Sequence, residues 1–163
     1  MKRTSLSLVL LFTVLVLSGC QQSEKKELLL NALFTDHMVL QQKKEVAFWG
    51  SYTPNEEITV HGSWGSESTC VADAEGQWKL RITTPKAGGP YEVTIGTKST
   101  TKSIKDVLIG EVWLASGQSN MEMDFDYCCN TTDFSELERA TANYPNIRMI
   151  NVKKQLSLTP VQE

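Results

Sequence analysis

The middle of the chain reads Gly110-Glu111-Val112-Trp113-Leu114-Ala115-Ser116-Gly117-Gln118-Ser119-Asn120-Met121. Residues 112–115 are apolar and predict a buried strand that ends in a turn of small residues. A serine just beyond such a strand lies at the carboxyl edge of an α/β sheet, where nucleophilic serines are displayed. Gly117 allows a sharp turn, and Ser119 is expected to begin a helix whose backbone N–H groups can face an oxyanion. The pattern predicts a nucleophile at Ser119, with a helix N-cap serine as the alternative.

The surrounding residues predict the beginning of an α/β domain over residues 107–163. Residues 107–115 hold a near-continuous apolar run, typical of a strand buried on both faces of a parallel sheet. Asp133 is expected to cap a helix from Phe134 to about Asn143, and residues 147–152 read as another strand. A parallel sheet needs further strand–helix–strand units to cover both faces. We therefore expect an incomplete α/β portion with exposed apolar surface around residues 107–115.

Residues 28–106 have the pattern of short antiparallel strands. Apolar and polar residues alternate there, as in Trp78, Leu80 and Ile82 against Lys79 and Arg81, and as in Ile58, Val60, Val93 and Ile95. Turn signals separate these segments at Pro54-Asn55, Asp73 to Gly76, Gly88-Gly89-Pro90 and Gly96. Short strands at this spacing predict a β-sandwich-like domain over residues 28–106.

The amino terminus predicts export and a lipid anchor. Lys2 and Arg3 precede an apolar run from Leu6 to Leu17 that is short for a membrane span and suits a secretory signal. The run ends Leu17-Ser18-Gly19-Cys20, which resembles the bacterial lipobox. This resemblance implies a signal peptide over residues 1–19, lipid attachment at Cys20 and a polar tether over residues 20–27. We expect a protein anchored to a bacterial membrane, periplasmic or at the cell surface; the alternative is an ordinary signal peptide.

Composition argues against several other classes of protein. The formal net charge is −3 and no basic run is present, which speaks against nucleic-acid binding. No cofactor or metal is expected: histidines and cysteines lack zinc-site spacing, and Glu122, Asp124 and Asp126 read as a solvated acidic loop. Cys70 can pair with Cys128 or Cys129 in an oxidising compartment, Cys128 and Cys129 can form a strained vicinal disulfide, or all three can be free thiols.

Five segments together resemble one known family. They are Trp113–Met121, Leu33–Gln42, Val46–Gly50, Ala72–Trp78 and Gly88–Tyr91. Over residues 28–163 the chain resembles the sialate O-acetylesterase family of carbohydrate esterases, a branch of the SGNH hydrolases. The resemblance implies a β-sandwich-like amino-terminal domain followed by the start of an SGNH-hydrolase α/β domain of flavodoxin-like type.

The resemblance also implies a reaction. Ser119 would remove O-acetyl groups from sialic acid or related acetylated glycans, with a histidine from a late Asp-x-x-His block as the base. No histidine follows Ser119, so the chain corresponds to the amino-terminal portion of such an enzyme, and we expect little or no activity from it alone. The alternative is a non-catalytic lipoprotein β-module that binds a glycan or another partner.

Other residues that suggest chemistry are expected to be structural. Asp36 and His37 are adjacent on a predicted strand, so their side chains point to opposite faces and a triad with Ser119 is not expected. His61 reads as a surface or turn residue at a strand end. Trp78 and Trp49 are expected in the core by strand alternation, and Trp64 is the tryptophan of the β-rich part expected to be exposed.

Overall fold

The computed structural model describes residues 27–123, 135–152 and 157–159. Most of its regular structure is β-strand, with one 3-10 helix and one short α-helix. The elements are β1 (Leu29–Leu30), β2 (Val39–Gln41), β3 (Glu45–Ser51), β4 (Glu57–Gly62), β5 (Ser66–Val71), β6 (Gln77–Thr83), β7 (Gly88–Gly96), β8 (Thr101–Gly110), η1 (Ser119–Glu122) and α2 (Ser135–Thr141). Within the described ranges, no helix is long and apolar enough to cross a membrane.

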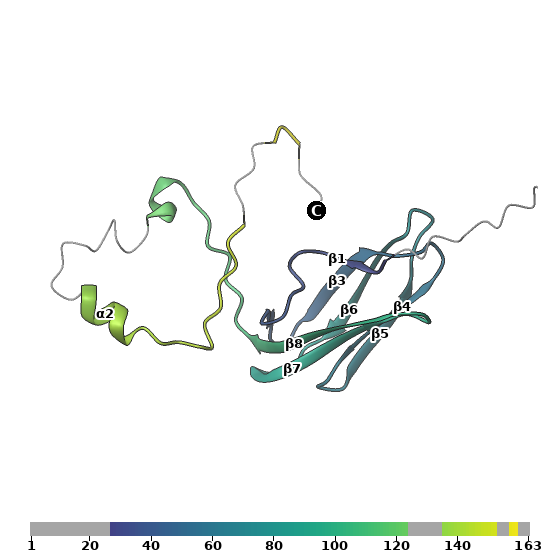
Figure 1. Cartoon of the computed structure of the whole chain (residues 1–163), viewed down its shortest axis with the longest axis horizontal. Helices are drawn as coiled ribbons and strands as arrows, with labels where there is room; N and C mark the ends of the chain where they lie inside the picture. The colour runs from purple at the N-terminus through teal and green to yellow at the C-terminus, as the bar shows by residue number, and fades with distance from the viewer. Residues whose placement is uncertain (1–26, 124–134, 153–156, 160–163) are drawn as a thin grey trace, which may run out of the picture.

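The strands form two sheets (Figure 1). The smaller sheet has the order β1-β3-β6, and its strand pairs are antiparallel. The larger sheet has the order β2-β8-β7-β4-β5, in which β2 and β8 pair in parallel and the other neighbours are antiparallel. The parallel pair sets Val39 opposite Leu108 and Gln41 opposite Gly110. This pairing places the first strand of the larger sheet directly beside the point where β8 ends.

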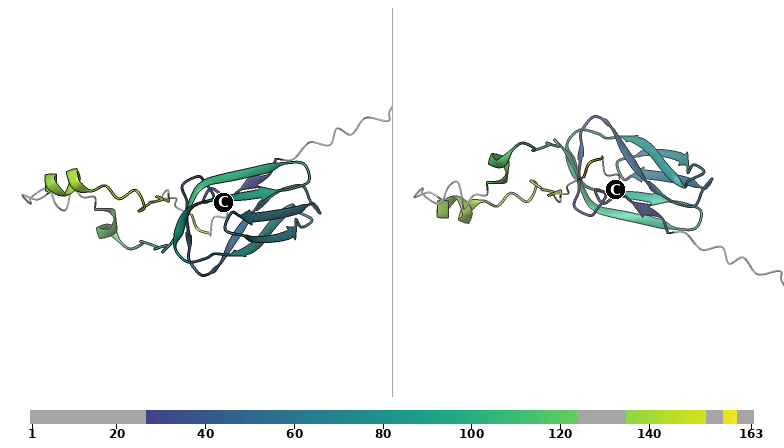
Figure 2. Two further views of the ribbon diagram at one scale, coloured as in Figure 1. Left: turned by 90° about the horizontal axis from the view of Figure 1, so that it is seen from below. Right: turned by 90° about the horizontal axis from the view of Figure 1, so that it is seen from above.

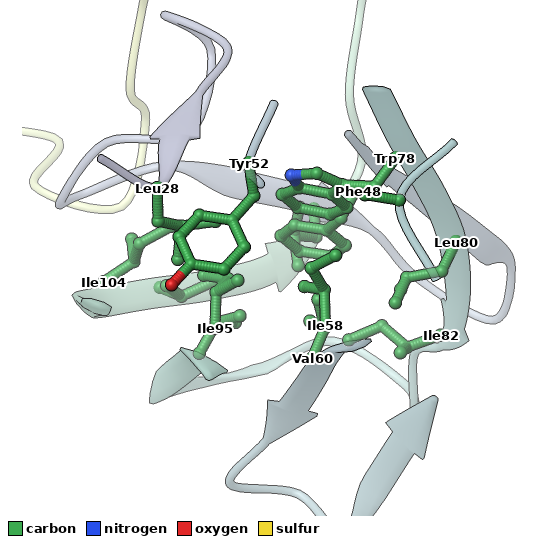
Figure 3. Close-up of a cluster of buried hydrophobic side chains, with 14 of the residues drawn as sticks. Leu28, Phe48, Tyr52, Ile58, Val60, Trp78, Leu80, Ile82, Ile95 and Ile104 are labelled. Atoms are coloured by element: carbon green, nitrogen blue, oxygen red, sulfur yellow. The ribbon is translucent and has the colours of Figure 1, made fainter. Parts of the chain in front are cut away.

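One hydrophobic core is built from both sheets. The alternation predicted for residues 77–83 is confirmed, because β6 has alternating exposed and buried residues. The core draws the following side chains from both sheets: Leu28, Leu40, Phe48, Tyr52, Ile58, Val60, Ala72, Trp78, Leu80, Ile82, Val93, Ile95, Ile104, Val107 and Ile109. Figure 3 shows Phe48 and Trp78 of the smaller sheet facing Ile58 and Val60 of the larger. Burial of this apolar surface is the main force that holds the two sheets together.

The turn predicted at Asp73–Gly76 joins β5 to β6. The Asp73 side-chain Oδ1 accepts hydrogen bonds from the backbone N–H groups of Glu75 (3.1 Å) and Gln77 (2.7 Å). Gly76 has φ +82°, a conformation in which a side chain is strained. Its carbonyl accepts a hydrogen bond from the N–H of Tyr52 at 2.8 Å, so the turn also contacts the end of β3.

The strand boundaries around residue 107 differ from the prediction. β8 continues past residue 106 to Gly110, and Val107 and Ile109 are buried in the same core as the earlier strands. Residues 107–109 therefore belong to the larger sheet and pair with β7 and β2, instead of opening a new parallel sheet. The expected strand at 112–115 is wrong: these residues form no strand, and Leu114 is 93% exposed. A short apolar run does not reveal which sheet it enters, because periodicity records burial and not the identity of the neighbouring strand.

The chain beyond Gly110 leaves the two sheets (Figure 2). It contains η1 and α2, and α2 confirms the helix predicted from about 134 to 143; the expected cap, Asp133, lies outside the described residues. The strand predicted over residues 147–152 is wrong, because that segment has no regular structure. The prediction of exposed apolar surface is confirmed for 112–115, whereas Val107 and Ile109 are buried.

Candidate functional site

Ser119 is the first residue of η1, on the segment that follows β8. The N–H of Met121 donates to the carbonyl of Gln118 at 2.9 Å, which closes the short helical turn. The N-cap position belongs to Gln118, so the alternative role of Ser119 as the N-cap residue does not match this turn. Ser119 is exposed, as are the other residues from 111 to 123. A hydroxyl at this position is open to a reactant in solution.

Gly117 packs closely against the side chain of Met121 in this turn. A Cβ atom at Gly117 would lie 2.6 Å from Cγ of Met121, closer than such atoms approach in proteins. Any larger residue at position 117 would therefore displace the Met121 side chain. The small residue that the sequence pattern picked out has a steric reason, although its backbone is not in the left-handed region.

The hydrogen-bond partner of the His37 side chain is Asp106 and not Ser119. Its Nδ1 is 2.5 Å from Oδ2 of Asp106, while the Asp36 carboxylate accepts the backbone N–H of Lys105 at 2.7 Å. Asp36 does not orient His37, as predicted, but the expected reason is wrong, because residues 36–37 form a turn before β2 and not part of a strand. His61 is exposed on β4, opposite Glu67 and Thr94. Across the described ranges, neither histidine hydrogen-bonds to Ser119.

Two carboxylates near the end of β8 take part in the contacts between the sheets and the described chain beyond Gly110. The Glu111 carboxylate accepts hydrogen bonds from Nε2 of Gln41 (2.8 Å) and Nε2 of Gln42 (2.7 Å). The Asp106 carboxylate accepts from His37 and, at 2.8 Å, from Nη2 of Arg148. These bonds favour the charged forms and lower the pKa of both carboxyl groups below their ordinary values: Glu111 through Gln41 and Gln42, Asp106 through His37 and then Arg148.

The sequence reasoning did not identify these anchoring residues. Gln41 and Gln42 stand in one of the segments that carry the family resemblance, and two adjacent glutamines after an apolar strand were the available signal. Asp106 and Arg148 had no such signal, because the two are far apart in the chain.

The tryptophans are distributed only partly as predicted. Trp78 is in the core at 3% exposure, as expected. Trp49 is half-buried, with its ring 4.7 Å from Phe34 in an edge contact. Trp64 is also half-buried, which corrects the expectation that it is exposed: its Nε1 donates to the Thr83 carbonyl at 2.8 Å, and its ring meets Tyr91. A hydrogen bond to β6 holds this ring against the sheets.

The remaining predicted groups are only partly described. Glu122 is exposed, and Asp124 and Asp126 lie outside the described residues. Cys70 is half-buried and forms no disulfide among the described residues, and burial raises the pKa of its thiol. Cys20, Cys128 and Cys129 also lie outside the described residues, so lipid attachment and the alternative cysteine pairings stay predictions.

Comparison with known proteins shows related esterases. A sialate O-acetylesterase from Mus musculus is 38% identical over 127 residues, which cover 72% of this chain and 23% of the mouse protein. The sialate O-acetylesterase from Homo sapiens is 37% identical over 135 residues, covering 77% of this chain and 24% of the human protein. The match therefore spans about a quarter of the length of these relatives.

A solved structure is similar in fold and sequence. It is the crystal structure of a carbohydrate acetylesterase from Xanthomonas citri, with a TM-score of 0.61 and 37% sequence identity. The similarity covers 73% of this chain and 26% of the Xanthomonas chain. No family model matches the chain.

Proposed function

Because this chain is a homologue of the sialate O-acetylesterase family over about three quarters of its length, we propose that it carries the nucleophile of a carbohydrate O-acetylesterase at Ser119. The observation that carries the proposal is this homology, together with the exposed position of Ser119 at the start of η1. The proposed substrate is O-acetylated sialic acid or a related acetylated glycan.

The proposed reaction is acyl transfer in two steps. Oγ of Ser119 attacks the acetyl carbonyl carbon and gives its proton to a base, while backbone N–H groups hold the oxyanion. The bond to the sugar oxygen then breaks, and that oxygen takes the proton. Water attacks the acetyl-serine, releases acetate and restores the hydroxyl. An unassisted serine hydroxyl is a weak nucleophile at neutral pH, so the base is essential.

The base is proposed to come from a later Asp-x-x-His block, as the family resemblance implies. Within the described residues, His37 hydrogen-bonds to Asp106 and not to Ser119, and His61 lies on β4. The 163-residue chain alone is therefore expected to show little or no hydrolysis.

The two-sheet core supports a β-sandwich-like domain, which we propose is followed by the beginning of an SGNH-hydrolase α/β domain. β8 ends at Gly110, so we place the change between the two there instead of after residue 106. The exposed apolar side chains beyond Gly110 fit a portion that is covered by further elements in a complete α/β domain.

The test begins with the gene. Its reading frame is sequenced past the codon for Glu163, and the complete product is purified beside the 163-residue chain. Both are assayed for acetate release from O-acetylated N-acetylneuraminic acid and from an acetylated neutral sugar. We expect an Asp-x-x-His block in the continuing frame, hydrolysis by the complete product, and loss of hydrolysis in Ser119→Ala.

Ser116→Ala is the matched control, because Ser116 is an exposed serine on the same segment. It should leave hydrolysis within about twofold, since a surface substitution away from the chemistry has a small effect. A complete product that hydrolyses equally well with Ser119→Ala would remove Ser119 as the nucleophile. A stop codon directly after Glu163, with no hydrolysis, would instead favour a non-catalytic β-module.

Export and lipid attachment at Cys20 are a second proposal, which rests on the residues alone. The chain with its amino terminus is expressed in a bacterium and partitioned between detergent and water. Wild type and Cys70→Ser should enter the detergent phase, because acyl chains add about 0.8 kcal/mol of membrane affinity per buried CH₂. Cys20→Ser should stay in water; detergent partitioning of that variant would refute the proposal.

A further inference from the structure

The described chain beyond β8 contacts the larger sheet at two places, once before Ser119 at Glu111 and once after it at Arg148. At the first place, β8 stops at Gly110 and the chain continues through Glu111. At the second place, the side chain of Arg148 contacts Asp106 of β8. Figure 1 shows both passages beside the end of β8, and the hydrogen bonds of Arg148 to Asp106 confirm the contact.

The first contact fixes the direction in which the chain leaves β8. The amides of Gln41 and Gln42 each donate to one oxygen of the Glu111 carboxylate. Oε1 of Gln41 accepts the N–H of Val112 at 2.9 Å, and the N–H of Gln42 donates to the Gly110 carbonyl at 2.8 Å. Four hydrogen bonds from the end of β2 therefore hold three successive residues after the last core position.

The second contact depends on one side chain. Arg148 donates through Nη1 to the Asp106 carbonyl and, at 3.5 Å, to the Met38 carbonyl, while Nη2 donates to Oδ2 of Asp106. Asp106 has φ +53°, a left-handed conformation that aspartate tolerates better than most residues. Nδ1 of His37 is hydrogen-bonded to the same Oδ2. Asp106 therefore connects β8 with the turn at His37 and with the stretch around Arg148.

The exposure of residues 144–152 shows that Arg148 is the side chain through which this stretch contacts the sheets. From Tyr144 to Val152 all residues are exposed except Arg148, whose side chain is 19% exposed. Its neighbours Ile147 and Met149 are 69% and 95% exposed, so apolar packing against the sheets does not hold this segment. The planar guanidinium of Arg148 donates hydrogen bonds through both of its terminal nitrogens to Asp106, which fixes the geometry of the contact.

We propose that Glu111 and Arg148 form a two-point clamp that positions the Ser119 segment against the end of the larger sheet, and that Arg148 is a positioning residue for the reaction. The docking stands on the contacts described above. Its consequence for catalysis rests on the proposed function of Ser119. Misplacement of a reacting group by about 1 Å can lower a rate by about 100-fold, which is why a distant clamp can affect the reaction.

Docking is tested by NMR on the isotopically labelled 163-residue chain. Arg148→Lys keeps the charge but loses the planar fork. It should shift the amide signals of Met38 and Asp106, and it should lower the backbone order parameters of residues 144–152 toward the range of flexible chain, below about 0.6. Glu111→Gln should have a corresponding effect on residues 111–113 by weakening the bonds of Gln41 and Gln42.

A double variant and a control make the result specific. Asp106→Asn tolerates the left-handed backbone and removes the charge, so combining it with Arg148→Lys should lower the order parameters no further than either change alone. Lys102→Gln removes the ion pair between Lys102 and Glu27, 3.1 Å in length, on the sheets themselves. This control should leave residues 144–152 unchanged.

Three outcomes separate the two proposals. Ser119→Ala should retain the wild-type docking signals whether or not Ser119 is the nucleophile. In a complete product that releases acetate from O-acetylated substrate, Arg148→Lys should lower kcat by about 10-fold to 100-fold with KM nearly unchanged, as expected for misplacement of the nucleophile. The clamp is refuted if wild-type residues 144–152 are already as mobile as in Arg148→Lys, or if the shifts stay within the sequence neighbours of residue 148.

Discussion

Single residues at the turns decide how the strands connect. Gly76 and Gly65 both have positive φ, +82° and +93°, but their surroundings differ. A Cβ at Gly76 would lie 2.3 Å from the backbone oxygen of Tyr52, whereas a Cβ at Gly65 would meet nothing within 4 Å. A comparison of alanine substitutions at the two positions therefore distinguishes the loss of stability due to backbone conformation from the additional loss due to a steric clash.

Gly76→Ala is expected to destabilise the protein far more than Gly65→Ala. The conformational cost alone is about 1 kcal/mol and applies to both positions. At Gly76 the clash with a backbone atom should raise the total to roughly 3 kcal/mol or more. The measurement is urea unfolding of both variants, and equal losses of unfolding free energy would show that the turn at Gly76 relaxes freely.

At the scale of elements, β4 is the strand on which the larger sheet depends. It pairs with β5 on one side and with β7 on the other, and its inward residues Ile58 and Val60 are fully buried. β5 is an edge strand with a different character, and its last residue, Val71, is 59% exposed. Valine thus occurs once in a central, buried position (Val60) and once in an exposed position on an edge strand (Val71).

Val60→Ala should cost roughly 2 kcal/mol of unfolding free energy, because it removes buried methyl groups and leaves a cavity. Val71→Ala should change stability by at most about 0.5 kcal/mol, since that side chain is largely in water. Thermal unfolding monitored by circular dichroism compares the two. Similar losses would mean that Val71 is covered in solution.

At the scale of the molecule, the described residues up to Ile109 contain a core, and the described residues beyond it do not. The buried apolar residues run from Leu28 to Ile109, and none of the described residues beyond Ile109 is among them. Trp113, Leu114 and Met149 are 86%, 93% and 95% exposed. Large apolar side chains that are exposed to this degree are typical of an interface or an uncovered domain face.

The chain is therefore expected to bind the apolar dye ANS without being unfolded. Leu114→Ser and Met149→Ser should lower the ANS fluorescence, while their unfolding free energies stay within about 0.5 kcal/mol of wild type. Leu29→Ser is the control from the sheets, where Leu29 is 52% exposed outside the segment beyond Gly110. Cooperative unfolding of a monomer that binds no dye would contradict the expected exposed surface.

Local patterns in the sequence predicted several elements correctly, although the strands expected at 112–115 and 147–152 are absent from the structure. Alternation of apolar and polar residues predicted β6 and the inward residues of β4 and β7, because in an extended chain successive side chains face opposite sides. Turn residues predicted Asp73–Gly76, and helix signals predicted α2. The segments that resemble sialate O-acetylesterases predicted the relatives that the comparisons found.

Contacts between distant residues required the folded chain. The apolar run at Val107 and Ile109 predicted a buried strand, but only the pairing of β8 with β7 and β2 shows that these residues belong to the core of the two sheets. The bonds of Arg148 to Asp106 and of Glu111 to Gln41 join residues 42 and 70 positions apart. No local period encodes such contacts, because they depend on which strand ends the fold brings together; hydrogen bonds at those ends, and not hydrophobic burial, attach residues 111–112 and Arg148 to the sheets.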